Sequence, residues 1–173
     1  NEEILIGRIH KNLKSKEKKL LTIIIPRHVN RSKSIINELK KINLKIASHS
    51  TTRSLASNTD IYLVDTFGET SKFYNLTNVS FIGGSFIKHG GQNPLEAVRL
   101  GNYIVSGKNV DNFKEIYSYL KQNKISFFAN DKKGIEKIVK QKINKKLPNI
   151  FKNRIYNNGI KILNKNVFYI NKF

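Results

Sequence analysis

The stretch FIGGSFIKHGGQNPLEAVRLG, residues 81–101, decides how the fold is interpreted. An apolar run ends in a glycine pair, and a basic loop leads to a second glycine pair. Asn-Pro-Leu-Glu then opens a helix, which Gly101 ends. This pattern is typical of the strand–loop–helix units of parallel α/β sheets. Because ligands bind beyond the carboxyl ends of such strands, the glycine-framed loop is also a candidate binding site.

Short apolar runs alternate with helical periodicity along most of the chain. We expect strands at residues 20–26, 44–48, 60–66, 79–84, 103–107 and 125–130. We expect helices at residues 32–42, 68–76, 93–101, 112–123, 133–143 and 148–163. The alternation predicts the α/β class, with a doubly wound, Rossmann-like parallel sheet. An amphipathic helix opens the chain, whereas the first strand of such a sheet precedes its first helix. Either the chain is a fragment whose sheet lacks its first strand, or its sheet is built differently.

Composition narrows the class of protein. The 173 residues suit one domain, and a hydrophobic content of 39% suits a globular one. Cysteine is absent and the four histidines lack metal-ligand spacing, so we expect no structural metal site. As a separate expectation, the protein uses no cofactor. No apolar run is long enough to span a bilayer. The net charge of +20 is spread along the chain without a nucleic-acid-binding motif. We expect no nucleic-acid partner, although a basic surface attracts anionic lipid headgroups.

Two expected strands end in loops with polar side chains. In IPRHVNR, Pro26 and Arg27 follow the strand, and an arginine there can fork onto a phosphate or carboxylate. An ordinary surface arginine explains that loop equally well. In VDTFGET, Thr66 and Glu69 have capping-box spacing, which predicts a capped helix start. Free N–H groups at that start can also bind an anion, and Gly68 lets a ligand approach the backbone.

The quoted stretch supplies a third loop. The turn Gly83 to Ser85 exposes backbone amides that can cradle a phosphate. At the following helix we predict Asn93 as the N-cap, Pro94 as the first helical residue and Glu96 as the third. A carboxylate at Glu96 would repel a phosphate but can accept two hydrogen bonds from a ribose diol. Neither a dinucleotide fingerprint nor a P-loop is present, so the residues alone indicate a nucleotide or sugar-phosphate site.

Taken together, PRH, DTFGETSKFYNL, FIGGSF and GGQNPLEAVRLG resemble the C-terminal half of bacterial 3-deoxy-D-manno-octulosonic acid (Kdo) transferases, from about Leu20 to Leu120. The resemblance implies the C-terminal domain of a two-domain GT-B glycosyltransferase. That family transfers Kdo from CMP-Kdo to a lipid A precursor in lipopolysaccharide synthesis, without a metal. The donor contacts that it implies are Pro26, Arg27, Gly68, Glu69, Thr70, Gly83, Gly84, Ser85, Asn93, Pro94, Leu95 and Glu96.

The resemblance also assigns roles and shows departures. The glycines and the helix start at Asn93 would hold the phosphate, and Glu96 would bind the ribose. Arg27 would offset the phosphate charge as CMP leaves. Thr70 replaces the usual leucine and Gln92 the frequent histidine, and RHVNR lacks the family's proline and glutamate. These departures concern fine donor contacts more than the donor class.

The resemblance makes residues 1–173 a CMP-Kdo donor domain whose N-terminal acceptor domain is absent. The family's membrane anchor and its catalytic base lie in that other half, so we expect no catalytic residue here and no transfer by the isolated chain. The implied partners are CMP-Kdo and, through the other domain, a lipid A precursor at the cytoplasmic face of the inner membrane. Three alternatives stay open: another GT-B glycosyltransferase or sugar-nucleotide epimerase, an inactive remnant, and a basic nucleic-acid-binding module.

Overall fold

The computed structural model describes residues 2–153, 155 and 157. The strands are β1 (Thr22–Ile24), β2 (Ile46–Ser48), β3 (Ile61–Leu63), β4 (Val79–Phe81), β5 (Tyr103–Ser106) and β6 (Ser126–Phe128). The helices are α1 (Glu2–Lys14), α2 (Ser32–Lys41), α3 (Thr70–Tyr74), α4 (Leu95–Arg99), α5 (Lys114–Gln122) and α6 (Lys132–Lys142). Short 3₁₀ turns, η1 (Val29–Arg31) and η2 (Asp111–Phe113), precede α2 and α5.

These elements confirm the predicted order of strands and helices, although each strand is shorter than its apolar run. Residues 149–153 of the expected last helix are helical, whereas residues 154, 156 and 158–163 lie outside the described part. Gly101 follows α4 with a φ of +96°, and its N–H donates to the Val98 carbonyl, as expected of a helix-terminating glycine.

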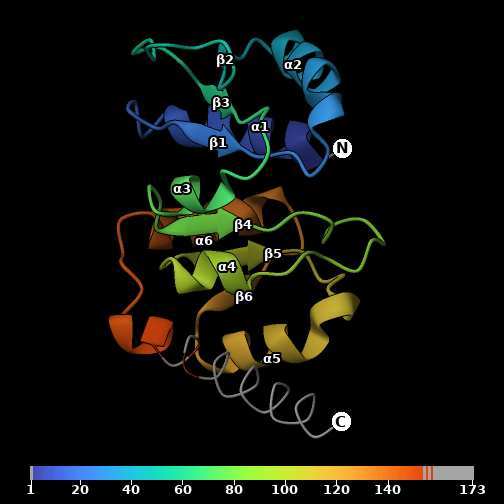
Figure 1. Ribbon diagram of the computed structural model, residues 1–173, viewed down its shortest axis with the longest axis vertical. Coiled ribbons are helices and arrows are strands. Elements are labelled where there is room, and N and C mark those ends of the chain that lie inside the picture. The colour runs from blue at the N-terminus through green and yellow to red at the C-terminus, as the bar shows by residue number, and fades with distance from the viewer. Residues whose placement is uncertain (1, 154, 156, 158–173) are drawn as a thin grey trace, which may run out of the picture.

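The strands form two parallel sheets rather than the single predicted one. Their orders are β1-β3-β2 and β4-β5-β6, and β1 and β4 are the facing edges in Figure 1. Among the described residues, no strand pairing joins β1 to β4. The predicted parallel α/β class is confirmed, with the strands divided between two sheets where the prediction was one sheet that lacks its first strand. The interruption falls in the middle of the strand order, where the first strand of a doubly wound sheet lies.

Helices cover both faces of the sheet that β4, β5 and β6 form. Because side chains alternate along a strand, Ile104 and Val105 of β5 point to opposite faces. Ile104 packs with Leu120 of α5, whereas Val105 packs with Ile9 of α1 and Ile135 of α6. Both β5 side chains are fully buried, as expected of a parallel strand between two helical layers.

The other sheet follows the same plan. Ile61 and Leu63 of β3 are fully buried against α2, through Leu39. Tyr62 points to the opposite face, where its ring lies 6.0 Å from that of Phe73 in α3. Each of the two sheets therefore has helices on both of its faces, as predicted for a doubly wound sheet.

Helix α1 packs against α2 of one sheet and α6 of the other. Close packing with α2 requires Gly7, since a Cβ there would lie 2.6 Å from Cδ2 of Leu39. The buried His10 has Nδ1 2.9 Å from the Thr22 hydroxyl and Nε2 3.4 Å from the Asp60 carboxylate. These contacts anchor α1 at the amino ends of β1 and β3, so α1 connects the two sheets.

Candidate functional site

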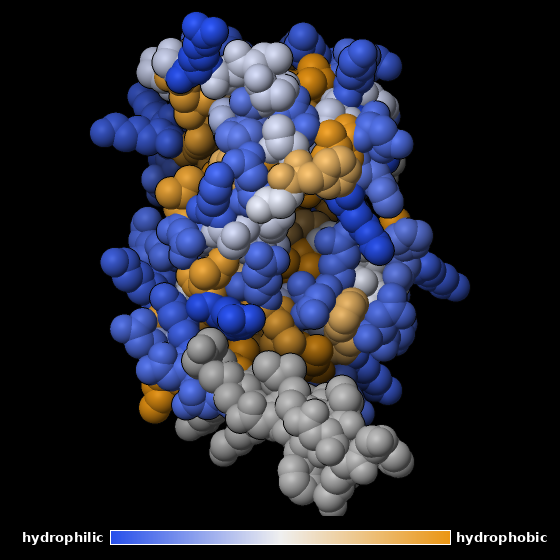
Figure 2. All heavy atoms as spheres, viewed as in Figure 1, coloured by the Kyte–Doolittle hydropathy of each residue, from blue (hydrophilic) through white to orange (hydrophobic). Residues whose placement is uncertain are grey.

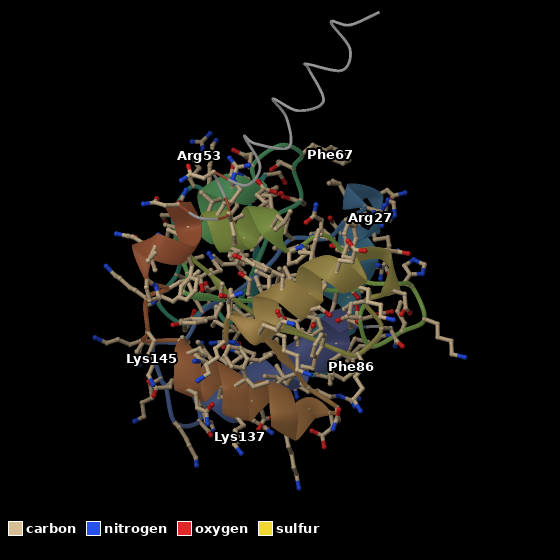
Figure 3. The ribbon with its side chains drawn as sticks, turned by 90° about the horizontal axis from the view of Figure 1, so that it is seen from below. Arg27, Arg53, Phe67, Phe86, Lys137 and Lys145 are labelled. Atoms are coloured by element: carbon tan, nitrogen blue, oxygen red, sulfur yellow. The ribbon has the colours of Figure 1, made fainter. Side chains whose placement is uncertain are left out.

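The predicted site residues lie in loops that follow parallel strands. Arg27, Phe67 and Phe86 come after β1, β3 and β4, and all three lie in the right half of Figure 3, whereas Lys137 and Lys145 lie in its left half. Parallel strands bring their carboxyl ends to the same edge of a sheet, which is the usual place of an α/β ligand site. The structure therefore brings the three predicted loops to the same end of the two sheets.

The loop after β1 presents Arg27 to solvent. Pro26 is buried, whereas Arg27 is exposed. The N–H of Val64 donates to the Ile24 carbonyl at 2.9 Å, so β1 and β3 stay paired at their carboxyl ends. The loops that carry Arg27 and the DTFGET element therefore begin side by side, and the guanidinium is accessible to an anionic ligand.

The loop after β3 differs from the predicted capping box. Helix α3 begins at Thr70, and its N-cap is Glu69, whose side chain makes no capping hydrogen bond. Thr66 does not cap a backbone N–H as predicted; its hydroxyl donates to Oε2 of Glu69 at 2.7 Å. The two side chains bond to each other rather than to the helix start. Gly68 has a φ of +82° and open space beside its Cα, so a ligand can approach the backbone there.

The Glu69 carboxylate is the centre of a polar cluster. The ammonium of Lys72 lies 2.6 Å from Oε1, and Nε2 of His49 lies 2.7 Å from Oε2. The hydrogen bond from Lys72 and then that from Thr66 lower the pKa of Glu69 to about 2. On its other ring nitrogen, His49 lies 2.7 Å from the Tyr62 hydroxyl. Glu69 is therefore a fixed, ionised acceptor at neutral pH, beside the open backbone at Gly68.

Sequence reasoning missed the contribution of the loop after β2. His49 follows β2 directly, and the N–H and hydroxyl of Ser50 donate to Asp65 at 2.8 and 2.6 Å. The rule that functional groups follow the carboxyl ends of strands would have found His49. The prediction considered only its distance from the other histidines along the chain.

The loop after β4 is packed tightly. Ser85 is fully buried, and its hydroxyl donates to the Ile82 carbonyl and accepts from the N–H of Gly107, both at 2.8 Å. The N–H of Gly91 donates to the carbonyl of Gly84 at 2.9 Å, and both glycines have a positive φ. The two glycine pairs of the opening stretch therefore let the ends of this loop approach each other, and the Ser85 side chain holds the loop from inside.

The amides of this loop already have an acceptor. The N–H groups of Gly84, Ser85 and Phe86 donate to the carboxylate of Glu2 at 2.6, 3.1 and 2.8 Å. A Cβ at Gly83 would lie 3.2 Å from the same carboxylate. Glu2 and Gly84 are separated by 82 positions, so no local pattern in the sequence could reveal the contact.

The helix after this loop starts one residue later than predicted. Helix α4 begins at Leu95 with Pro94 as its N-cap, so Asn93 is not the N-cap and Glu96 is not the third residue. The Asn93 side chain still accepts from the N–H of Leu95 at 3.0 Å, because asparagine readily bonds to the backbone two residues on. Glu96 is exposed in the first turn, whereas Leu95 packs on the core.

The surface beside the loops has a hollow at the carboxyl ends of β4, β5 and β6. Its volume is about 270 Å³, and it is lined by Ser85, Phe86, Lys108, Asn109, Ala129 and Asn130. Figure 2 shows hydrophilic residues over much of the visible face, with apolar residues in patches between them. A nucleotide-sized ligand would lie across the loops rather than in an enclosed cavity.

Two kinds of site are not found within the described residues. No three potential metal ligands lie close enough to share an ion, and no helix is long and apolar enough to cross a membrane.

No family model matches the chain. The 3-deoxy-D-manno-octulosonic acid transferase of Haemophilus influenzae is 35% identical to it over 119 residues, which cover 69% of this chain and 28% of that protein. The protein of the same name from Rickettsia felis is 41% identical over 123 residues, covering 71% of this chain and 26% of that protein. The chain thus spans about a quarter of the length of these relatives.

A solved structure agrees in both sequence and fold. The C-terminal CMP-Kdo binding domain of WaaA from Acinetobacter baumannii superposes with a TM-score of 0.74 and 30% sequence identity. The match covers 79% of this chain and 72% of that domain. A shared fold alone would not establish kinship, but the sequence identity over the same region does. The resemblance found in the sequence is therefore confirmed, and the chain belongs to the 3-deoxy-D-manno-octulosonic acid transferase family, in the part that corresponds to the C-terminal GT-B domain.

Proposed function

We propose that this chain binds CMP-Kdo as the donor domain of a Kdo transferase. The observation that carries the proposal is the likeness to the Acinetobacter CMP-Kdo binding domain, with a TM-score of 0.74 at 30% identity. The loops after β1, β3 and β4 supply the accessible groups that a nucleotide needs: the cationic Arg27, the open backbone at Gly68 and the exposed carboxylate of Glu96.

We assign each loop a share of the donor. Arg27 would pair with the phosphate and offset its charge as CMP leaves, because a guanidinium can bind two phosphate oxygens at once. Glu96, exposed in the first turn of α4, would accept hydrogen bonds from the ribose hydroxyls. Gly68 and the Glu69 carboxylate would contact the remaining polar edge of the nucleotide. Asn93 would help to hold the phosphate at the start of α4.

For the whole protein, we propose Kdo transfer to a lipid A precursor at the cytoplasmic face of the inner membrane. The net charge of +20 supports contact with anionic headgroups, since each basic residue near such a surface is attracted by about 1 kcal/mol. The catalytic base would belong to the acceptor domain. We expect this chain alone to bind donor without transferring Kdo.

Calorimetric titration of the folded chain with CMP, UMP and AMP tests donor binding. We expect CMP to bind selectively and Arg27→Ala to weaken it, because that change removes a cation from the phosphate. The control is Arg8→Ala, which removes an equal charge from an exposed position of α1 outside the candidate site. Selective UMP binding would point to another GT-B enzyme. Equal binding of all three nucleotides would contradict donor recognition, and failure of a folded chain to bind any of them would contradict binding by this domain alone.

A further inference from the structure

The carboxylate of Glu2 is bound by three consecutive backbone amides. Its Oε2 accepts from the N–H of Gly84 at 2.6 Å, and its Oε1 accepts from Ser85 at 3.1 Å and Phe86 at 2.8 Å. Successive N–H groups that converge in a turn form an anion-binding concavity. Hydrogen bonds to an ionised acceptor are also the stronger kind. The turn after β4 is therefore an anion site, and a side chain of the same chain fills it.

Both partners of this contact are held in place. Helix α1, which carries Glu2, is fixed by the buried side chains of Ile9, His10 and Leu13. On the other side, the buried Ser85 hydroxyl is bonded to the Ile82 carbonyl, directly after β4, and to the Gly107 N–H, directly after β5. Glu2 is thus unlike a surface glutamate that samples many positions. Its carboxylate reaches the amides from a rigid helix.

We infer that Glu2 is a positioning residue of the donor loop: its carboxylate fills the anion site made by the amides of residues 84–86 and holds the backbone that leads from β4 towards α4. The inference rests on the proposed donor binding. It also means that the donor phosphate does not bind these three amides, since a carboxylate already occupies them.

The neighbouring glutamate offers a matched control. Glu3 lies on the same turn of α1, but its carboxylate pairs with the guanidinium of Arg31 at 3.0 Å and does not reach the loop. Glu2→Ala and Glu3→Ala each remove one negative charge from the start of α1. Only Glu2→Ala empties the anion site at residues 84–86, so a difference between the variants reports on that site and not on helix stability or net charge.

The first test observes the amides directly, by amide NMR spectra of the folded chain during titration with sodium formate. In Glu2→Ala we expect the resonances of Gly84, Ser85 and Phe86 to move from their original positions and to return partly, with saturation, as formate fills the site. The wild-type chain and Glu3→Ala should show no such response, and sodium chloride controls for ionic strength. The inference is wrong if these three resonances are unchanged in Glu2→Ala, or if formate moves them equally in the wild-type chain.

The second test asks whether the occupied site matters for the donor. We expect Glu2→Ala to weaken CMP binding by about tenfold, equivalent to about 1.4 kcal/mol, and formate to restore part of it. Glu2→Gln keeps the volume but places an amide against the three N–H groups. It should therefore weaken binding without rescue by formate, and it replaces the alanine variant if that one does not fold. Tighter CMP binding in Glu2→Ala would contradict positioning, because Glu2 would then compete with the donor.

The two proposals fail in different ways. If the wild-type chain does not bind CMP, the proposed function of this domain fails, and the amide titration still decides whether Glu2 fills the anion site. If CMP binds but Glu2→Ala binds it as tightly as Glu3→Ala does, the donor proposal stands and the positioning role of Glu2 is wrong.

Discussion

His49 and Glu69 join the carboxyl ends of β2 and β3, with Nε2 of the histidine 2.7 Å from Oε2 of the carboxylate. The other ring nitrogen of His49 lies 2.7 Å from the Tyr62 hydroxyl. The Glu69 carboxylate is thus held from two sides, by this ring and by the Lys72 ammonium at 2.6 Å. Glu69, which we propose to contact the donor, therefore presents a carboxylate of fixed charge and orientation.

This cluster predicts an acid-sensitive contribution to stability. Hydrogen bonds from Lys72 and then Thr66 lower the pKa of Glu69 from 4.5 to about 2. Because the folded-state pKa is depressed, the contribution is complete above pH 4.5 and is lost as the pH falls towards 2. Glu69→Gln should therefore be less stable than the wild-type chain at neutral pH, and the gap in unfolding free energy should close in this acid window.

Urea unfolding at a series of pH values measures that gap, and carboxyl NMR titration measures the pKa of Glu69. Glu115→Gln, an exposed change on α5, is the control and should lack the acid-dependent gap. An ordinary pKa for Glu69 would show that the cluster does not form in solution.

Buried His10 predicts a second pH dependence, nearer to neutrality. Burial lowers its pKa below the ordinary value of 6.5, although its hydrogen bond to Asp60 acts in the opposite direction. The unfolded chain therefore takes up a proton near pH 6.5 that the folded chain does not. Stability should fall as the pH drops below this value, and His10→Gln should remove that part of the dependence.

Urea unfolding between neutral and mildly acidic pH checks this prediction. His28→Gln, at an exposed histidine, is the matched control and should keep the wild-type dependence. We also expect His10→Gln to cost about 1–3 kcal/mol at neutral pH, because it disturbs a buried hydrogen-bonding group. An unchanged pH dependence in His10→Gln would contradict the assignment.

If Glu96 binds the ribose, removing its carboxylate and removing the ribose 2′-hydroxyl should weaken CMP binding by disrupting the same contact. Removal of the carboxylate in Glu96→Ala should weaken CMP binding about tenfold, since hydrogen bonds to charged groups are among the stronger ones. Removal of the 2′-hydroxyl from the ligand should weaken binding to the wild-type chain, but not further in Glu96→Ala. Calorimetry with CMP and 2′-deoxy-CMP on both proteins completes the cycle. Independent, additive losses would mean that Glu96 does not bind this hydroxyl.

The contact between Gly107 and the donor loop predicts a packing defect. A Cβ at Gly107 would lie 2.6 Å from the carbonyl carbon of Ser85, which is backbone and cannot move aside alone. Gly107→Ala should therefore destabilise the fold by about 1–3 kcal/mol and weaken CMP binding.

Gly68→Ala is the comparison for this packing defect. It meets open space, and its only cost is the strain of a φ of +82°, about 1 kcal/mol. Urea unfolding compares the two variants. Equal stability of Gly107→Ala and the wild-type chain would contradict the close approach at Ser85.

The elements could be predicted because each depends on neighbours in the chain. The apolar runs LLTIIIP and DIYLVDT predict buried strands, and both strands are present. Helix starts were less certain. Helix α3 begins at Thr70 rather than Gly68, since the Thr66 and Glu69 side chains bond to each other and not to the backbone. Such choices depend on the other partners of Glu69, one of which, His49, lies in the loop after β2.

The sequence by itself determined the α/β class, the loops at the strand ends and, through their motifs, the family. Only the tertiary structure decided that the strands pair as two sheets, that His49 joins Glu69, and that Glu2 fills the amide site at residues 84–86. The physical reason is the separation of the interacting residues along the chain. Periodicity and turn residues report on hydrogen bonds within a few positions, whereas the partners of Glu2 lie more than 80 positions away. They meet it only because α1 packs against α2 beside one sheet and α6 beside the other.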